Sequence, residues 1–216
     1  MARAVPWFPV VGAAIGATSG GIYVLADEFL NVRVAATIAV GLALLITGAF
    51  HHDGLADIAD AFGGGWTVER RLEILKDSRL GTYGTAALCM ALLAEVLAIS
   101  ELKGWEAFGA IIVAHSLGRA MALTAMLLAP AGGNGMGADY MTRLSPISVF
   151  CGILFGVIMT LLFSPVFPLA TIGVAALPTI AVVALSIRKI GGINGDVLGA
   201  ITVPVSYTHL TLPTKA

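Results

Sequence analysis

Three aspartates spaced one helical turn apart are the residues of this sequence that most strongly suggest chemistry. Asp53, Asp57 and Asp60 stand at positions i, i+4 and i+7, which places their carboxylates on one face if the segment is a helix continuing from the apolar run before it. Like charges in such a stripe repel, and oxygen ligands grouped in this way suit a hard divalent cation. The pattern predicts a Mg²⁺ site, and the alternative is a solvated acidic helix end.

A second group of charged residues follows the glycine run Gly63–Gly65. It alternates acids with cations, namely Glu69, Arg70, Arg71, Glu73, Lys76, Asp77 and Arg79. One interpretation is a surface helix stabilised by i,i+4 ion pairs. The other is a phosphate-binding wall in which Lys76 and Arg79 flank Asp77, because phosphoryl transfer needs cations to stabilise charge on the transferring group. The residues alone leave both open.

The composition places these groups in a membrane protein. Hydrophobic residues make up 58% of the chain and charged residues 12%, and the mean hydropathy is +0.94, outside the usual balance of a soluble domain. Net charge is only −1, so no basic field suggests a nucleic-acid partner. Apolar segments of about the length of a membrane span occur at 9–26, 32–50, 83–100, 107–129, 147–163 and 165–187. We expect an all-α polytopic bundle with about six spans in a lipid bilayer.

The positions of lysine and arginine predict the orientation of this bundle. Segment 51–82 carries four cations, so we place it in the cytoplasm. Alternating spans then bring Arg3, Arg143, Arg188 and Lys189 to that side and leave Arg33 and Lys103 opposite. The polar loops 51–82, 130–146 and 188–199 fall on one face, where they could form one site.

Ionisable residues also occur inside the expected spans. His115 and Arg119 lie one turn apart in the fourth span, and Glu95 in the third is the natural partner of Arg119 by charge. An intramembrane arginine is costly and suggests function, but a structural Glu95–Arg119 pair and a substrate contact are both open. His51 and His52 could ligate metal, carry protons or cap a helix at the interface.

Glycine-rich stretches occur in two of the polar loops. Residues 132–139 and 191–196 allow close backbone approach to a ligand and could offer amide groups to phosphate. The chain then ends on a polar, β-branched tail, 204–216. The start of this tail is similar to a translated transposon-end sequencing adapter, so we expect a membrane domain over 1–203, incomplete at its C-terminus, and a non-native tail over 204–216.

Several of these motifs, in order, resemble cobalamin synthase, the adenosylcobinamide-GDP ribazoletransferase of bacteria and archaea. The matching stretches are Val5–Gly12, His51–Gly64, Arg71–Gly84 and Gly191–Ala200. The family continues beyond the last of them into a further helix and span, where this chain enters its tail. The resemblance implies an enzyme of cobalamin biosynthesis in the cytoplasmic (inner) membrane, with its site facing the cytoplasm.

The implied reaction is a Mg²⁺-dependent transfer. A ribose hydroxyl of α-ribazole, or of its 5′-phosphate, attacks the corrinoid-side phosphorus of adenosylcobinamide-GDP and displaces GMP. In this reading the metal ligands are Asp53, Asp57 and Asp60, and Asp77 is a fourth ligand or the base. Lys76 and Arg79 contact phosphate, and the substrate-binding candidates are Arg70, Arg71, Arg119, Asn194 and Asp196.

Two other classes of function compete. The acidic pattern is similar to that of the CDP-alcohol phosphotransferases, but Asp57 stands where their motif expects arginine and their later aspartate spacing is missing. A membrane transporter would place its ionisable groups near the bilayer midplane, whereas the acidic cluster here is expected at the interface.

Overall fold

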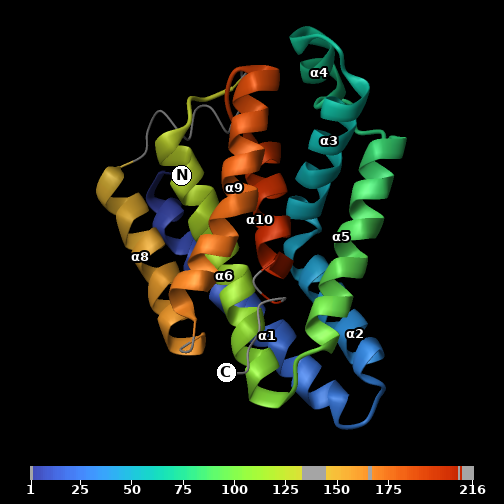
Figure 1. Cartoon of the computed structure of the whole chain (residues 1–216), viewed down its shortest axis with the longest axis vertical. Helices are drawn as coiled ribbons and strands as arrows, with labels where there is room; N and C mark the ends of the chain where they lie inside the picture. The colour runs from blue at the N-terminus through green and yellow to red at the C-terminus, as the bar shows by residue number, and fades with distance from the viewer. Residues whose placement is uncertain (1, 133–144, 165–166, 209, 211–216) are drawn as a thin grey trace.

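The computed structural model describes residues 2–132, 145–164, 167–208 and 210. After a short 3-10 turn at Ala2–Trp7, the described residues form α-helices joined by short loops (Figure 1). These helices are α1 (Phe8–Asp27), α2 (Val32–Thr47), α3 (Phe50–Gly64), α4 (Val68–Ile74), α5 (Thr82–Ser100), α6 (Gly104–Leu128), α8 (Pro146–Phe163), α9 (Pro168–Ile190) and α10 (Gly195–Thr208). The all-α prediction is confirmed.

The number of spans also agrees with the sequence. Among the described residues, five helices are long and apolar enough to cross a membrane, and the bent pair of α2 and α3 makes a sixth candidate span. Pro178 lies inside α9 without ending that helix. The chain is therefore a multi-pass membrane protein, as its composition predicts. Helix α10 runs through Pro204 to Thr208, so the proposed start of the foreign tail coincides with no break in the helix.

The break between α2 and α3 was not predicted. The sequence interpretation of the aspartates was conditional on a helix continuing from the second span, and this condition is not met, because the two helices meet at 89°. Gly48 adopts the left-handed conformation with φ 59° and donates its N–H to the carbonyls of Leu44 and Leu45, which closes α2. Ala49 follows with φ 57°. The acidic helix α3 thus takes its own direction, set by the helices it packs against.

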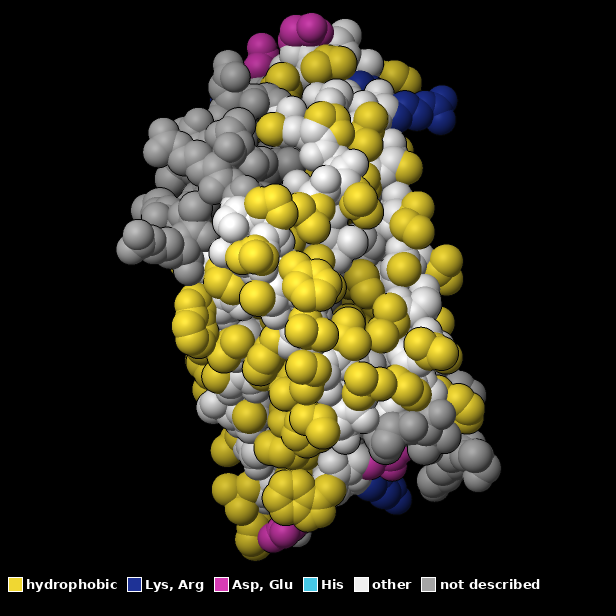
Figure 2. Space-filling model, turned by 90° about the vertical axis from the view of Figure 1, so that its left-hand side faces the viewer, with side chains coloured by type: hydrophobic (Ala, Val, Ile, Leu, Met, Phe, Trp, Pro, Cys, Tyr) yellow, Lys and Arg dark blue, Asp and Glu magenta, His cyan; other side chains and the backbone are white. Residues whose placement is uncertain are grey.

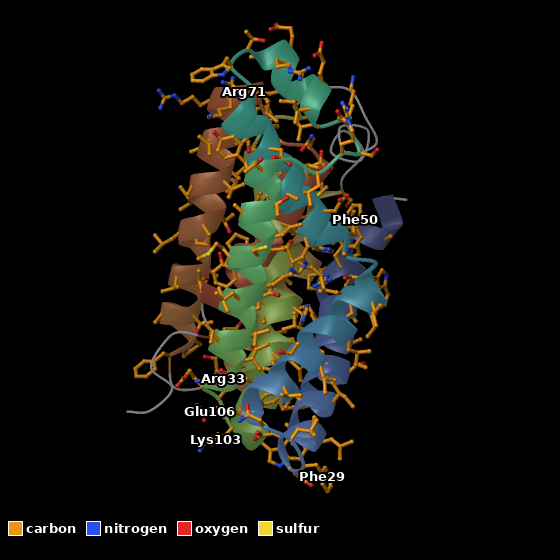
Figure 3. The ribbon with its side chains drawn as sticks, turned by 90° about the vertical axis from the view of Figure 1, so that its right-hand side faces the viewer. Phe29, Arg33, Phe50, Arg71, Lys103 and Glu106 are labelled. Atoms are coloured by element: carbon orange, nitrogen blue, oxygen red, sulfur yellow. The ribbon has the colours of Figure 1, made fainter. Side chains whose placement is uncertain are left out.

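The outer surface agrees with a lipid environment. Figure 2 shows one face covered mostly by hydrophobic side chains between two ends where the charges gather. Large exposed apolar residues of α8 and α9 include Ile147, Phe150, Leu162, Leu169, Leu177 and Ile180. Arg33 and Lys103 lie at the end of the molecule opposite Arg71 (Figure 3). These three cations thus lie at opposite ends of the molecule, as the alternating spans require.

Helix α6 is the central helix of the bundle and packs against α1, α8 and α10. Two glycines of α1 permit this close approach. A Cβ added at Gly16 would lie 2.7 Å from the carbonyl oxygen of Ile111, and one at Gly12 would collide with the carbonyl oxygen of His115. Small residues of this kind let membrane helices approach closely enough for their backbones to pack. His115 and Arg119 of α6 are held inside the bundle as a result.

Candidate functional site

The acidic helix α3 packs against α5 on one side and α10 on the other. Gly54 lies against the first turn of α10, where an added Cβ would be 2.8 Å from the carbonyl oxygen of Asp196 and 3.0 Å from its Cα. This contact, which only glycine permits, brings Asp196 to the acidic face. Asp53, Asp196 and Asp60 are the charged neighbours of Asp57. Four carboxylates from two helices therefore share one region.

Asp60 has a different environment from the other acids. Its Oδ2 accepts the N–H of Gly81 at 2.7 Å, and its Oδ1 accepts that of Gly84 at 2.8 Å. These donors belong to the start of α5, where the first N–H groups of a helix lack intrahelical partners. Both oxygens of Asp60 are thus engaged by backbone. Its role as a metal ligand stays a prediction. In the structure, Asp60 binds the start of α5 to α3.

Asp196 is fixed within the first turn of α10. Asn194 Oδ1 accepts the N–H of Val197 at 3.0 Å, and Asn194 Nδ2 donates to Asp196 Oδ2 at 3.1 Å. Burial raises the pKa of Asp196; the Asn194 hydrogen bond opposes this shift, and the nearby charge of Asp53 adds to it. Asn194 and Asp196, both predicted as substrate-binding residues, thus belong to the acidic site.

This acidic group suits a cation by its chemistry. Among the described residues, the ion pairs are His52–Glu95, Arg70–Glu73 and Arg79–Asp77, so Asp53, Asp57 and Asp196 form no ion pair there. The described residues contain no cluster of three His, Cys, Asp or Glu side chains already gathered around a metal position. Mg²⁺ usually keeps several waters and uses one or two carboxylates with substrate phosphate. The donor set therefore fits Mg²⁺ without a closed protein cage.

Asp77 lies in the loop between α4 and α5, paired with Arg79. Arg79 Nη2 donates to Asp77 Oδ2 at 2.6 Å, and Arg79 Nε donates to Oδ1 at 2.9 Å. These hydrogen bonds lower the pKa of Asp77 to about 2, with help from the charges of Arg79 and Arg70. A carboxylate with so low a pKa is a weak base. The α3 carboxylates are not among the charges acting on Asp77, so the structure does not unite it with them.

Two neighbouring arginines of α4 have unlike environments. Arg70 forms an exposed pair with Glu73 at 2.9 Å, as the surface-helix interpretation predicts. Arg71 instead donates to the backbone carbonyls of Gly65, Trp66 and Lys189. It therefore joins the end of α3 to the end of α9. The side chain of Lys76, between these arginines and Arg79, forms no ion pair within the described residues.

The three polar loops do meet, as the sequence predicts. Lys189 Nζ donates to the carbonyl of Phe62 at 2.7 Å, which adds to the Arg71 contact between 51–82 and 188–199. The loop that begins at 130 is joined to 188–199 by two backbone hydrogen bonds. Gly132 N–H donates to Ile193 O at 2.7 Å, and Ile193 N–H donates to Pro130 O at 2.9 Å. Residues 133–144, including most of the first glycine-rich stretch and Arg143, lie outside the described residues.

The intramembrane charges pair differently from the expectation. Glu95 accepts from Ser206 Oγ at 2.8 Å and lies 3.2 Å from His52 Nε2, and among the described residues no ion pair joins it to Arg119. Of the two interpretations that the sequence left open for Arg119, the structural pair with Glu95 does not form among the described residues. Arg119 is 6% exposed and donates to the carbonyl of His115 at 2.8 Å. A small cavity is lined by all five of these residues and by His51.

Sequence reasoning missed two relationships within this site. It did not place Asp196 beside Asp53, although Gly54 within the acidic stripe allows the close approach. It did not pair His52 with Glu95, because no spacing relates residues 43 positions apart.

Comparison with known proteins identifies the family. Residues 1–212 match the family model described as cobalamin-5-phosphate synthase. Curated relatives named adenosylcobinamide-GDP ribazoletransferase include one from Vibrio cholerae, 37% identical over 93% of this chain and 78% of its own length. One from Ralstonia pickettii is 37% identical over 91% and 78%, and one from Shewanella sp. strain W3-18-1 is 36% identical over 92% and 78%. No solved structure matches the chain. The chain therefore belongs to the cobalamin-5-phosphate synthase family and is a transferase of cobalamin biosynthesis.

Proposed function

We propose that this chain transfers the adenosylcobinamide phosphate group of adenosylcobinamide-GDP to α-ribazole or its 5′-phosphate. A ribose hydroxyl oxygen forms the new bond to the corrinoid-side phosphorus, the bond from that phosphorus to the GMP oxygen breaks, and GMP leaves. The names of the curated relatives support the substrates. The observation that carries the proposal is that Asp53 and Asp196 are charged neighbours of Asp57, in the region where Gly54 lets α3 contact the first turn of α10.

The proposed cofactor is Mg²⁺, held by Asp53, Asp57 and Asp196. When bound there it would neutralise charge on the diphosphate. Asp60 is a less suitable ligand because the start of α5 already engages both of its oxygens. A carboxylate of this cluster accepts the proton of the attacking hydroxyl. In the predicted set of metal ligands, Asp60 is thereby replaced by Asp196 from the first turn of α10.

Cations of the neighbouring loop complete the proposed site. Arg79 and Lys76 stand between α4 and α5, next to the glycines that bind Asp60. The side chain of Arg79 is 87% exposed, so it can turn toward an incoming diphosphate at little cost. In such a contact it would exchange the Asp77 carboxylate for phosphate oxygens, because a guanidinium binds both in the same forked geometry. Asp77 then serves to hold Arg79 ready before substrate binds.

The proposed location is the cytoplasmic (inner) membrane, with this site at the cytoplasmic face. The support is the charge distribution, since Arg70, Arg71, Lys76 and Arg79 lie in one segment. Arg71 of this segment lies at the end opposite Arg33 and Lys103. Short loops rich in lysine and arginine stay in the cytoplasm. Water-soluble nucleotide substrates would then reach the site without crossing the bilayer.

The proposal is tested by assaying the chain in reconstituted vesicles beside the Vibrio cholerae relative as positive control. Adenosylcobinamide-GDP, Mg²⁺ and either α-ribazole or its 5′-phosphate are supplied, and GMP and the corrinoid product are measured by chromatography. We expect equal molar amounts of both products and none without an acceptor. GMP release without a joined corrinoid product, or CMP release from a CDP-alcohol instead, would contradict the proposal.

A further inference from the structure

Helix α3 is fastened to α5 at two points on one of its faces. Near its start, His52 Nε2 lies 3.2 Å from Glu95 Oε2. Two turns later, Asp60 accepts the N–H groups of Gly81 and Gly84. Between them, the carbonyl of Ala56 lies where a Cβ on Gly84 would approach to 2.9 Å. His52, Ala56 and Asp60 stand at i, i+4 and i+8 and so form one stripe, which faces α5.

The His52–Glu95 contact is the one polar attachment to another helix that the described residues show for the side chains of the first turn of α3. No side chain caps that turn, because the preceding residue is Ala49 in the left-handed conformation after an 89° bend. Both partners are nearly buried, with side-chain exposures of 15% and 10%. Loss of Glu95 would be costly, since His52 Nε2 would lose this partner in a largely buried position. It therefore fixes the direction in which the first turn of α3 faces.

This face determines where the carboxylates point. Asp53 and Asp57 each follow a residue of the α5-facing stripe by one position, which is about 100° around a helix. Rotation of α3 about its axis would move both carboxylates away from Asp196 on α10. The Asp60 attachment holds the far end of α3, whereas Asp53 is next to His52. The first turn is thus the part whose rotation the His52–Glu95 contact controls.

We propose that Glu95, in the middle of a membrane span, is a positioning residue that holds Asp53 and Asp57 toward Asp196 through its contact with His52. This rests on the proposed metal site formed by those carboxylates. It gives Glu95 a task in the transferase reaction without contact to substrate. Arg119, the partner of Glu95 that charge alone favours, does not take part in this positioning.

The test measures divalent-cation binding, which does not depend on turnover. Mn²⁺ is titrated into the purified chain in detergent, and free Mn²⁺ is followed by electron paramagnetic resonance. The variants are Glu95→Ala, Glu95→Gln, His52→Ala and the double variant Glu95→Ala/His52→Ala. Glu106→Ala, which removes an exposed acid at the far end of the molecule, is the matched control, and Asp53→Asn defines loss of the site.

We expect Glu95→Ala and His52→Ala each to weaken Mn²⁺ binding by about tenfold, which is the coupling typical of residues in direct contact. The double variant should be no weaker than Glu95→Ala, because that substitution already removes the His52 attachment together with the contact to Ser206. Glu95→Gln keeps an oxygen that can accept from His52 and should restore most of the affinity. Lowered thermal stability in Glu95→Ala with unchanged Mn²⁺ affinity would overturn the proposal, as would effects that add in the double variant.

The outcomes also separate this inference from the metal site itself. If Asp53→Asn binds Mn²⁺ as the unaltered chain does, the proposed metal site is wrong and the role of Glu95 falls with it. If Asp53→Asn abolishes binding while Glu95→Ala and Glu106→Ala both bind normally, the metal site stands and only the positioning role is wrong.

Discussion

Gly84 lies directly against the carboxylate of Asp60, whose Oδ1 accepts its N–H at 2.8 Å. An added Cβ would collide with Asp60 Oδ2 and would lie 2.9 Å from the carbonyl of Ala56. We therefore expect Gly84→Ala to lower the free energy of unfolding by about 2 kcal/mol, as overpacking of a filled site does. Thermal unfolding in detergent measures this change. Gly21→Ala is the control, because nothing lies within 4 Å of its added Cβ, and a loss of stability as large there would contradict the account.

Arg71 and Arg70 should differ strongly when substituted, although they are neighbours in sequence. Arg71 donates to three backbone carbonyls that join α3, α4 and α9, so Arg71→Ala should cost about 2 kcal/mol of stability, the range for hydrogen bonds from charged groups. Arg70 forms an exposed ion pair with Glu73, so Arg70→Ala should cost less than about 1 kcal/mol. Chemical denaturation in mixed micelles compares the two. Equal losses would show that Arg71 does not join these helices.

The pairing of Asp77 with Arg79 predicts a specific pH response. The pKa of Asp77 in the folded chain, about 2, lies below its ordinary value of 3.8. The pair therefore contributes fully above pH 3.8 and is lost as pH falls through about 2. In Arg79→Gln the titration midpoint of Asp77 should rise toward 3.8. Carboxyl ¹³C NMR at low salt measures both midpoints, and an unchanged midpoint in Arg79→Gln would mean that the pair does not form in solution.

The proposed orientation can be checked by labelling single cysteines in a background in which Cys89 and Cys151 are replaced by serine. Trp66 is 90% exposed near the Arg71 end, and Phe29 is 77% exposed at the opposite end. A membrane-impermeant maleimide added to intact cells should label Phe29→Cys and leave Trp66→Cys unlabelled until the cells are opened. The reverse pattern would place the acidic site outside the cytoplasm.

The sequence predicted the spans and the meeting of the polar loops because hydropathy and charge act over whole segments. It did not predict the bend at Gly48 and Ala49, since one glycine in an apolar run is compatible with a continuous helix. Asp60 has the same periodic spacing as Asp53 and Asp57, yet the backbone of α5 binds it. Which carboxylates gather depends on the packing of α3 between α5 and α10, and local spacing carries no information about such packing.

The same limit applies to Glu95. Charge alone favoured Arg119 as its partner, but α3 inserts His52 at 3.2 Å from Glu95. A pairing rule based on opposite charge cannot choose between two candidates on different helices until their positions are known. The structure therefore changes the role assigned to Glu95 and leaves Arg119 bonded to its own helix through the carbonyl of His115.

In the proposed site, Asp53, Asp57 and Asp196 bind the metal, whereas Asp60 holds α3 against the start of α5. The most direct measurement is the rate of GMP release from adenosylcobinamide-GDP, with α-ribazole as acceptor, at increasing Mg²⁺ concentrations. It compares Asp53→Asn, Asp57→Asn, Asp196→Asn and Asp60→Asn with the unaltered chain. We predict that the first three lose at least about a hundredfold in rate, the scale of removing a charge-stabilising group. Asp60→Asn should keep its rate at saturating Mg²⁺ and lose thermal stability. Undiminished release in Asp53→Asn or Asp196→Asn, or loss of Mg²⁺ dependence in Asp60→Asn alone, would contradict the account.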